Sequence, residues 1–111
     1  MNYRDGDIVF REGDQPRYMY VVLKGAVQIT SHGKPIERVE EGNALGVLSL
    51  LDGNPRTATA SALEDTELAI LDPKTFRYMV EEVPNFVWYV MGELAHRLRT
   101  TNAALTTNDA L

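Results

Sequence analysis

Aromatic and β-branched residues alternate with other residues along residues 18–30, and one glycine interrupts the pattern. The apolar positions are Tyr18, Tyr20, Val22, Val27 and Ile29, and Gly25 separates the two halves. A period of two is typical of strands that bury one face, and a glycine inside such a run predicts a bulge or a tight turn. This stretch therefore predicts two short antiparallel strands.

Similar short runs occur on both sides of this stretch. Residues 3–10 predict a turn that leads into a strand, and residues 31–34 predict a hairpin turn before a short strand at 35–39. Two more strands are predicted at 58–62 and 66–71. The chain is therefore expected to be mainly β up to about residue 71.

Two helices are expected after the strands. Asp72 followed by Pro73 predicts a helix start, because Asp is a preferred N-cap residue and proline suits the first helical position. Pro84 ends this helix, and Asn85 is placed to cap a last helix that runs to about Leu105. Apolar residues recur along that helix at helical and partly heptad spacing, namely Val87, Val90, Met91, Leu94, Leu98 and Leu105.

The apolar stripe of the last helix exceeds what a small domain needs to cover its strands. Part of it is expected to pack on the strands, and the remainder predicts a homodimer through Val90, Leu94, Leu98 and Leu105. The alternative is a helix that packs wholly on its own domain.

Composition limits the classes of function that the chain can have. It has 111 residues, 44% of them hydrophobic, so a single domain over residues 1–111 is expected. Cysteine is absent, which excludes disulfides, thiolate zinc sites and cysteine nucleophiles. His32 and His96 lie far apart, so an enzyme of the cupin type, which needs closely spaced histidines around a metal, is not expected. No catalytic residue and no metal ligand is expected.

Charge and hydropathy bear on partners and location. The net charge is −5, and the one basic cluster, residues 96–99, is interpreted as a solvated helix end, so no direct nucleic-acid contact is expected. No run is long and apolar enough to cross a membrane, and no secretion leader is visible at the N-terminus. These features predict no membrane contact and a cytoplasmic location.

One segment combines the groups that a small anion requires. Residues 46–51 read Gly-Val-Leu-Ser-Leu-Leu, and residues 55–59 read Pro-Arg-Thr-Ala-Thr. A helical turn that begins after Gly46 offers unpaired backbone amides, and Ser49 is small enough to let its amide approach a phosphate. Arg56 adds a permanent charge with a planar fork of donors, and Thr57 adds a hydroxyl and an amide. Because a buried phosphate needs such donors, this segment predicts an anion site.

These residues resemble the phosphate-binding cassette of cyclic nucleotide-binding domains, whose pattern is roughly G-E-[small apolar]-[A/S]-L-x, a short gap, and P-R-x-A-[T/S]. The first part of the chain is also similar to the family, at Tyr3, Gly6, Phe10, Glu12, Gly13, Asp14, Tyr20, Val21, Val22, Gly25 and Val27. The resemblance covers nearly the whole chain and is greatest to catabolite activator protein-like sensor domains without their DNA-binding domain. It implies an antiparallel β-roll of jelly-roll type over about residues 3–71, with C-terminal helices over about 72–107.

The resemblance also implies a ligand and a set of contacts. Cyclic AMP is the leading ligand, no other cofactor is implied, and cyclic AMP is not distinguished from cyclic GMP. The implied ligand-binding residues are Gly46, Val47, Leu48, Ser49, Arg56, Thr57, Thr101 and Asn102. The last two occupy the region where the activator subgroup reads the adenine amino group, and the alternative is a pair of exposed polar residues near a helix end.

Val47 departs from the family pattern, because the family has a glutamate after the cassette glycine. That carboxylate accepts a hydrogen bond from the ribose 2′-hydroxyl, and hydrogen bonds to charged groups contribute about 1.5–3 kcal/mol. Its loss predicts binding that is weaker by roughly ten- to a hundredfold. Glu40, Glu41 and Asn43 lie nearby but belong to the turn before the cassette, so they are not expected to replace it.

The sequence therefore predicts a regulatory domain that binds cyclic AMP weakly. The alternative is a degenerate cassette that binds no cyclic nucleotide. Such a module would serve in dimerisation or regulation, or bind another small anion. The chain is expected to be an isolated sensor module or a piece of a longer protein.

Overall fold

The structure is a computed structural model that describes the backbone of residues 1–105 and the side chains of residues 1–99. Its strands are β1 (Asn2–Tyr3), β2 (Ile8–Phe10), β3 (Met19–Lys24), β4 (Ala26–Ser31), β5 (Lys34–Glu40), β6 (Ala44–Leu45), β7 (Thr59–Ala62) and β8 (Thr66–Leu71). Its helices are α1 (Val47–Asp52), α2 (Pro73–Glu82) and α3 (Phe86–Leu105). The predicted end of the helical region, at about residue 107, lies outside the described residues.

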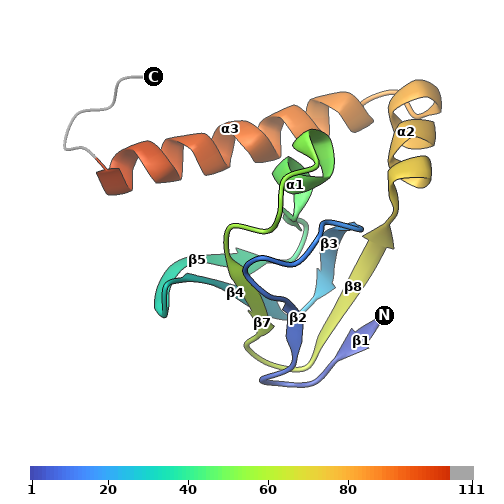
Figure 1. Ribbon diagram of the computed structural model, residues 1–111. Helices are drawn as coiled ribbons and strands as arrows, with labels where there is room; N and C mark the ends of the chain where they lie inside the picture. The colour runs from blue at the N-terminus through green and yellow to red at the C-terminus, as the bar shows by residue number, and fades with distance from the viewer. Residues whose placement is uncertain (106–111) are drawn as a thin grey trace.

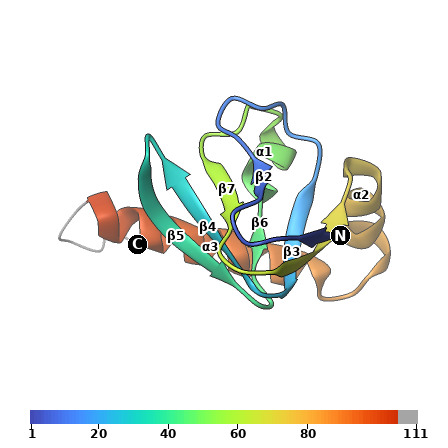
Figure 2. The same cartoon turned by 90° about the horizontal axis from the view of Figure 1, so that it is seen from below.

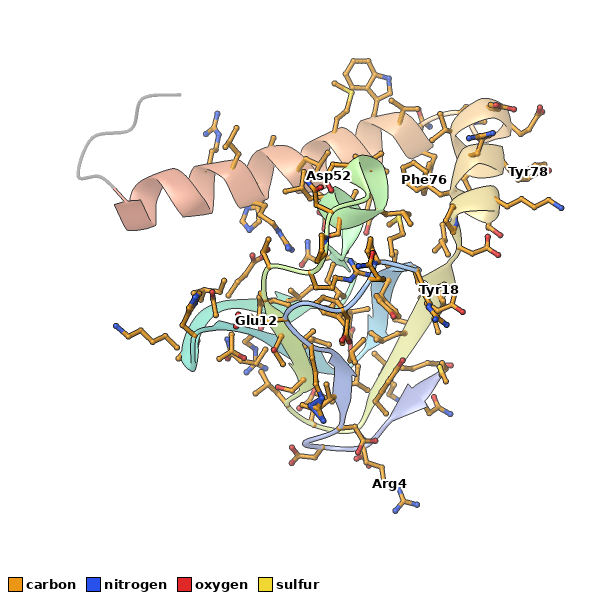
Figure 3. The ribbon with its side chains drawn as sticks, viewed as in Figure 1. Arg4, Glu12, Tyr18, Asp52, Phe76 and Tyr78 are labelled. Atoms are coloured by element: carbon orange, nitrogen blue, oxygen red, sulfur yellow. The ribbon has the colours of Figure 1, made fainter. Side chains whose placement is uncertain are left out.

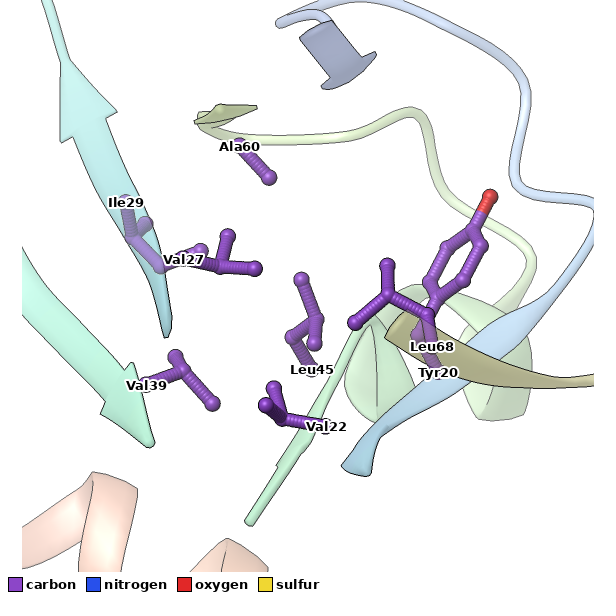
Figure 4. Close-up of a cluster of buried hydrophobic side chains, with 8 residues drawn as sticks. All are labelled: Tyr20, Val22, Val27, Ile29, Val39, Leu45, Ala60 and Leu68. Carbon is purple, nitrogen blue, oxygen red and sulfur yellow. The ribbon is translucent and has the colours of Figure 1, made fainter. Parts of the chain in front are cut away.

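Two antiparallel sheets form the roll. One has the strand order β1-β8-β3-β6 and the other β2-β7-β4-β5. The alternating side chains of each strand meet between the sheets, as expected for a jelly-roll core. The buried cluster there consists of Tyr20, Val22, Val27, Ile29, Val39, Leu45, Ala60 and Leu68 (Figure 4). The predicted fold class, mainly β with an antiparallel roll and C-terminal helices, is confirmed.

Gly25 is the point at which the chain leaves one sheet and enters the other. Its φ is 94°, a left-handed conformation that favours glycine. A Cβ at this position would lie 2.5 Å from Oγ1 of Thr66, which is buried and hydrogen-bonded to the Ala26 backbone. The predicted interruption at Gly25 is therefore a sheet-to-sheet crossing between β3 and β4.

The predicted start of the first helix after the roll, α2, is confirmed. The Asp72 carboxylate accepts a hydrogen bond from the Thr75 amide at 2.7 Å, and Pro73 is the first residue of α2. This hydrogen bond lowers the pKa of Asp72 below its usual value, because it stabilises the ionised carboxylate. Asn85 directly precedes α3 and has a φ of 72°.

The helix α3 lies across one end of the roll, and α1 lies between α3 and the strands (Figures 1 and 2). A second buried cluster joins these elements, and its members are Met19, Ala44, Val47, Phe86 and Val90. None of the described helices combines the length and apolar character that crossing a membrane requires.

The stripe predicted for dimerisation divides between two environments. Val90 is buried against the roll of its own chain, and Leu94 packs beside it, so the expectation that Val90 faces a second copy is wrong. Leu98 of this stripe is exposed, and so are Val87 and Met91 of the wider apolar set on the same helix. The side chain of Leu105 lies outside the described part of the chain.

Candidate functional site

The two halves of the cassette meet around one small pocket beneath α3. The pocket has a volume of about 150 Å³, and its lining includes Gly46, Val47, Leu48, Ser49, Arg56 and Thr57. The structure thus brings together six of the eight predicted site residues. Thr101 and Asn102 belong to α3, but their side chains lie outside the described residues.

The helix α1 begins directly after Gly46 and contributes its first backbone amides to this region. Leu48 is exposed, and Ser49 is half-buried beside it. Since the first amides of a helix have no intrahelical partner, they offer donors and a partial positive charge. Figure 3 shows α1, marked by Asp52, packed under α3 at the top of the roll.

Arg56 is buried, with 5% of its surface exposed. Its guanidinium donates from Nη1 to the Gly46 carbonyl at 2.9 Å and from Nη2 to the Tyr18 carbonyl at 2.5 Å. The Cζ atom lies 4.3 Å from the ring centroid of Phe10, a cation–π contact. Burial lowers the pKa of Arg56, yet arginine starts so far above neutrality that the group remains charged.

These contacts fix a permanent positive charge beside the start of α1. Among the described residues, two of the five guanidinium N–H groups donate to backbone carbonyls, which leaves three donors for an anion. The sequence predicted a permanent charge at this position but not these two carbonyl partners, and its role as the anion contact stays a prediction.

Gly46 leaves the space that this guanidinium occupies. Its φ is 80°, and a Cβ at this position would lie 2.7 Å from Nη1 of Arg56. Any larger residue would both strain the backbone and displace the guanidinium. Flexibility alone therefore does not account for this glycine.

Val47 occupies the position after the cassette glycine, and 5% of its surface is exposed. It belongs to the apolar cluster that includes Phe86 and Val90 of α3. A hydrophobic contact between α1 and α3 thus stands where the resemblance implies a carboxylate.

The acidic and amide groups before the cassette are held elsewhere. Glu40 pairs with Arg38 at 2.9 Å, and Glu41 accepts a hydrogen bond from the Gly25 amide at 3.4 Å. Neither residue lines the cassette pocket, and nor does Asn43. These positions support the expectation that none of the three replaces the missing carboxylate.

One face of α3 binds the backbone that leads into the cassette. The Tyr89 hydroxyl donates to the Gly42 carbonyl at 2.7 Å, and the Ala44 amide donates to Oε1 of Glu93 at 2.5 Å. Arg97 donates from Nη2 to the Ala44 carbonyl at 3.1 Å. The three side chains are spaced four residues apart, so they lie on one face of the helix.

Arg97 lines the cassette pocket and was missed by the sequence interpretation. The prediction of a fully solvated basic helix end is wrong here, because Arg97 is half-buried, lies 3.4 Å from Oε2 of Glu37 and lines the cassette pocket. Its spacing from Glu93 was visible in the sequence. Its hydrogen-bond acceptor, the Ala44 carbonyl, was not visible, because Ala44 belongs to β6, a strand of two residues that no local sequence pattern predicts.

This chain is similar to known proteins in both sequence and structure. A family model described as the cyclic nucleotide-binding domain matches residues 1–83. The cAMP-dependent protein kinase regulatory subunit of Debaryomyces hansenii is 35% identical over 82 residues, which are 72% of this chain and 18% of that protein. The cyclic AMP receptor protein of Thermus thermophilus is 32% identical over 108 residues, covering 93% of this chain and 50% of that protein.

Solved structures show the same similarity. The catabolite activator protein of Thermus thermophilus superposes with a TM-score of 0.83 at 30% identity, covering 95% of this chain and 52% of that chain. The cAMP-bound form of the EAL enzyme Bd1971 gives a TM-score of 0.67 at 31% identity, covering 94% of this chain and 29% of that chain. The chain spans half or less of the two relatives from Debaryomyces and Thermus.

Proposed function

Because this chain belongs to the cyclic nucleotide-binding domain family, we propose that its cassette pocket holds the phosphate of cyclic AMP between the start of α1 and Arg56. The observation that carries the proposal is the buried Arg56 guanidinium beside the first turn of α1. A cyclic phosphodiester carries one negative charge, and it would meet a fixed cation together with unpaired amides. In this role the domain is a regulatory module and not an enzyme.

Each cassette residue has a physical role in this proposal. Gly46 leaves room for the guanidinium, and the Ser49 amide and hydroxyl face the phosphate from α1. Thr57 is exposed at the rim of the pocket, where its hydroxyl and amide add donors. Arg97 supplies a second cation from α3, and its bond to Ala44 ties that helix to the strand before the cassette.

The base and the ribose are expected to be held less firmly than the phosphate. Thr101 and Asn102 follow Arg97 on the same helix, and we assign them the adenine edge, since each side chain both donates and accepts. Val47 offers the ribose 2′-hydroxyl no acceptor. Cyclic AMP binding should therefore be weak.

A degenerate cassette is the second candidate function, and Val47 is the observation that favours it. Its contact with Phe86 and Val90 gives the position a packing role that needs no ligand. Such a domain would bind no cyclic nucleotide, or would accept another small anion at Arg56, and would act through assembly.

Assembly into a homodimer is part of the proposal in either case. The exposed residues Val87, Met91 and Leu98 lie four and seven positions apart along α3, which is the spacing of a coiled-coil seam. A second copy of the same helix would cover this seam, as apolar side chains of this size each contribute about 1.5–3 kcal/mol when fully buried. This seam replaces the stripe through Val90.

The experiment that tests the proposed site is a charge placed at Thr57. Thr57→Asp puts a carboxylate at the exposed rim, and two like charges about 4 Å apart repel by roughly 1–4 kcal/mol, depending on how much water screens them. Titration calorimetry with cyclic AMP should show affinity at least fivefold lower than that of the native chain. Thr57→Asn is the matched neutral control, with an expected change of less than about threefold.

Equal effects of the two Thr57 substitutions would contradict a phosphate at this rim. Native binding that survives Thr57→Asp unchanged would place the ligand elsewhere. Absence of binding by the native chain would favour the degenerate cassette.

A further inference from the structure

A second hollow shares two walls with the cassette pocket but is otherwise built from different residues. Its volume is about 450 Å³, and it lies over Phe10, Asp14, Arg17, Tyr18, Tyr20 and Arg56. The volume falls in the range of small-molecule sites, roughly 300–1,000 Å³. Nothing in the proposed cyclic nucleotide site uses Arg17, Tyr18 or Tyr20 side chains.

Tyr20 gives this hollow an unpaired donor at its floor. The side chain is 6% exposed, and its hydroxyl makes no hydrogen bond with the described residues. Within the described part of the chain, every fully buried side-chain nitrogen or oxygen has a partner, so this hydroxyl must reach open space. Figure 4 shows it pointing away from the other side chains of the core cluster. Burial raises the pKa of Tyr20, so the phenol keeps its proton and remains a donor at neutral pH.

Charge in the hollow favours an anion. Arg17 and Arg56 contribute two positive charges, and Asp14 contributes one negative charge. The Asp14 carboxylate accepts the Arg11 amide at 3.0 Å, and its negative charge also acts on Arg56 and Tyr20, so Arg17 is the cation in the hollow that Asp14 does not offset. Arg17 is exposed, and its guanidinium makes no hydrogen bond or ion pair with the described residues, so its donors are available.

Aromatic rings line the same space. Phe10 and Tyr20 stack with centroids 6.0 Å apart, and Tyr18 meets Tyr20 edge-on at 6.2 Å. The guanidinium of Arg56 covers Phe10 at 4.3 Å. Such surfaces favour a planar ring, because rings pack edge-to-face or offset and arginine stacks on them.

We propose that this hollow is a second binding site, for a planar aromatic molecule that carries one carboxylate or phosphate group. The ring would pack against Tyr18, because Tyr20 and Arg56 already cover Phe10, and the anionic group would meet Arg17 and the Tyr20 hydroxyl. This site needs no cyclic nucleotide, so its test is independent of whether the cassette binds one.

The test uses benzoate and phenyl phosphate as probes, followed on the ¹⁵N-labelled chain by amide chemical shifts. Benzyl alcohol, which lacks the charge, and acetate, which lacks the ring, are the ligand controls. Either anionic probe should give saturable shifts at residues 14–20 with a Kd of about 1 mM, as expected for a ligand this small. The controls should give none at about 10 mM. The two probes distinguish a carboxylate ligand from a phosphate ligand.

Three substitutions locate the site. Tyr20→Phe removes one oxygen from a packed side chain, and Arg17→Gln removes an exposed charge, so both should leave the fold intact. Each should raise the Kd about tenfold, since each removes a hydrogen bond to an anion. Arg4→Gln is the matched control, because Arg4 is an exposed arginine at the other end of the roll (Figure 3), and it should change the Kd by less than about twofold.

The proposal is overturned by any of three results. They are no saturable shift with either anionic probe, affinity unchanged by both Tyr20→Phe and Arg17→Gln, and shifts confined to cassette residues 46–57. The last result would assign the probes to the cassette pocket alone.

Discussion

Replacement of Gly46 by alanine tests how Arg56 is seated in the cassette. The φ of 80° at this position costs a non-glycine residue about 1–2 kcal/mol. The new Cβ would lie 2.7 Å from Nη1 of Arg56, so the guanidinium must move and its 2.9 Å bond to the Gly46 carbonyl is lost. A hydrogen bond from a charged group is worth about 1.5–3 kcal/mol. Gly46→Ala should therefore lower the free energy of unfolding by about 2.5–5 kcal/mol.

Gly53 offers a control with the same backbone strain and no such contact. Its φ is 74°, it follows the other end of α1, and a Cβ there would meet nothing within 4 Å. Gly53→Ala should lose only about 1–2 kcal/mol. Urea unfolding followed by far-ultraviolet circular dichroism measures both variants, and a domain of this size is stable enough for the difference to be resolved. Equal losses in the two variants would refute the claim that Gly46 makes room for the guanidinium.

Two further predictions concern α3. Burial and the nearby Glu93 charge raise the pKa of Tyr89 from 10.0 to about 12, so the folded chain holds this proton more tightly than the unfolded chain. The contribution of protonated Tyr89 to the free energy of unfolding is therefore fully present below pH 10 and is lost as the pH rises towards 12. Urea unfolding over that range should show a steeper loss for the native chain than for Tyr89→Phe, and identical slopes would contradict the assignment. The native chain should also sediment as a dimer, and Met91→Glu should make it monomeric. Leu23→Glu, at another exposed apolar residue, is the control and should leave the dimer intact. A monomeric native chain would contradict the proposed dimer seam.

Local patterns determined much of the fold. The alternation from Tyr18 to Ile29 predicted β3 and β4, and Asp72 with Pro73 predicted the start of α2. These features depend on neighbours in the chain, such as the hydrogen bond from Thr75 to the cap. Each was therefore visible without tertiary information.

Tertiary contacts decided what the sequence did not reveal. Val90 and Met91 are adjacent and both apolar, and only the position of the roll makes one buried and the other exposed. Arg56 was expected to face an anion, but one of its partners is the Tyr18 carbonyl, which is 38 residues away. Its contact with that carbonyl follows from the packing of the β2–β3 segment on the cassette.

Val47 is where a single substitution should restore what the family pattern implies. Val47→Glu places a carboxylate beside the cassette pocket, which Arg97 also lines. Cyclic AMP affinity should rise roughly tenfold or more in Val47→Glu. Val47→Gln, whose side chain has the shape of glutamate, should gain less affinity, since its amide lacks the charge. Loss of the buried apolar contact should lower stability by about 1.5–3 kcal/mol in both variants. An unchanged affinity in Val47→Glu would show that the position does not face the ribose.

We propose that the native cassette holds the phosphate of a cyclic nucleotide without recognising its ribose hydroxyl. Calorimetry of the native chain with cyclic AMP and with its 2′-deoxy analogue tests this most directly, because the two ligands differ by that hydroxyl alone. Both ligands should bind, with affinities equal to within about twofold. A preference for cyclic AMP of about tenfold or more would contradict it, and so would the absence of binding by either ligand at millimolar concentration.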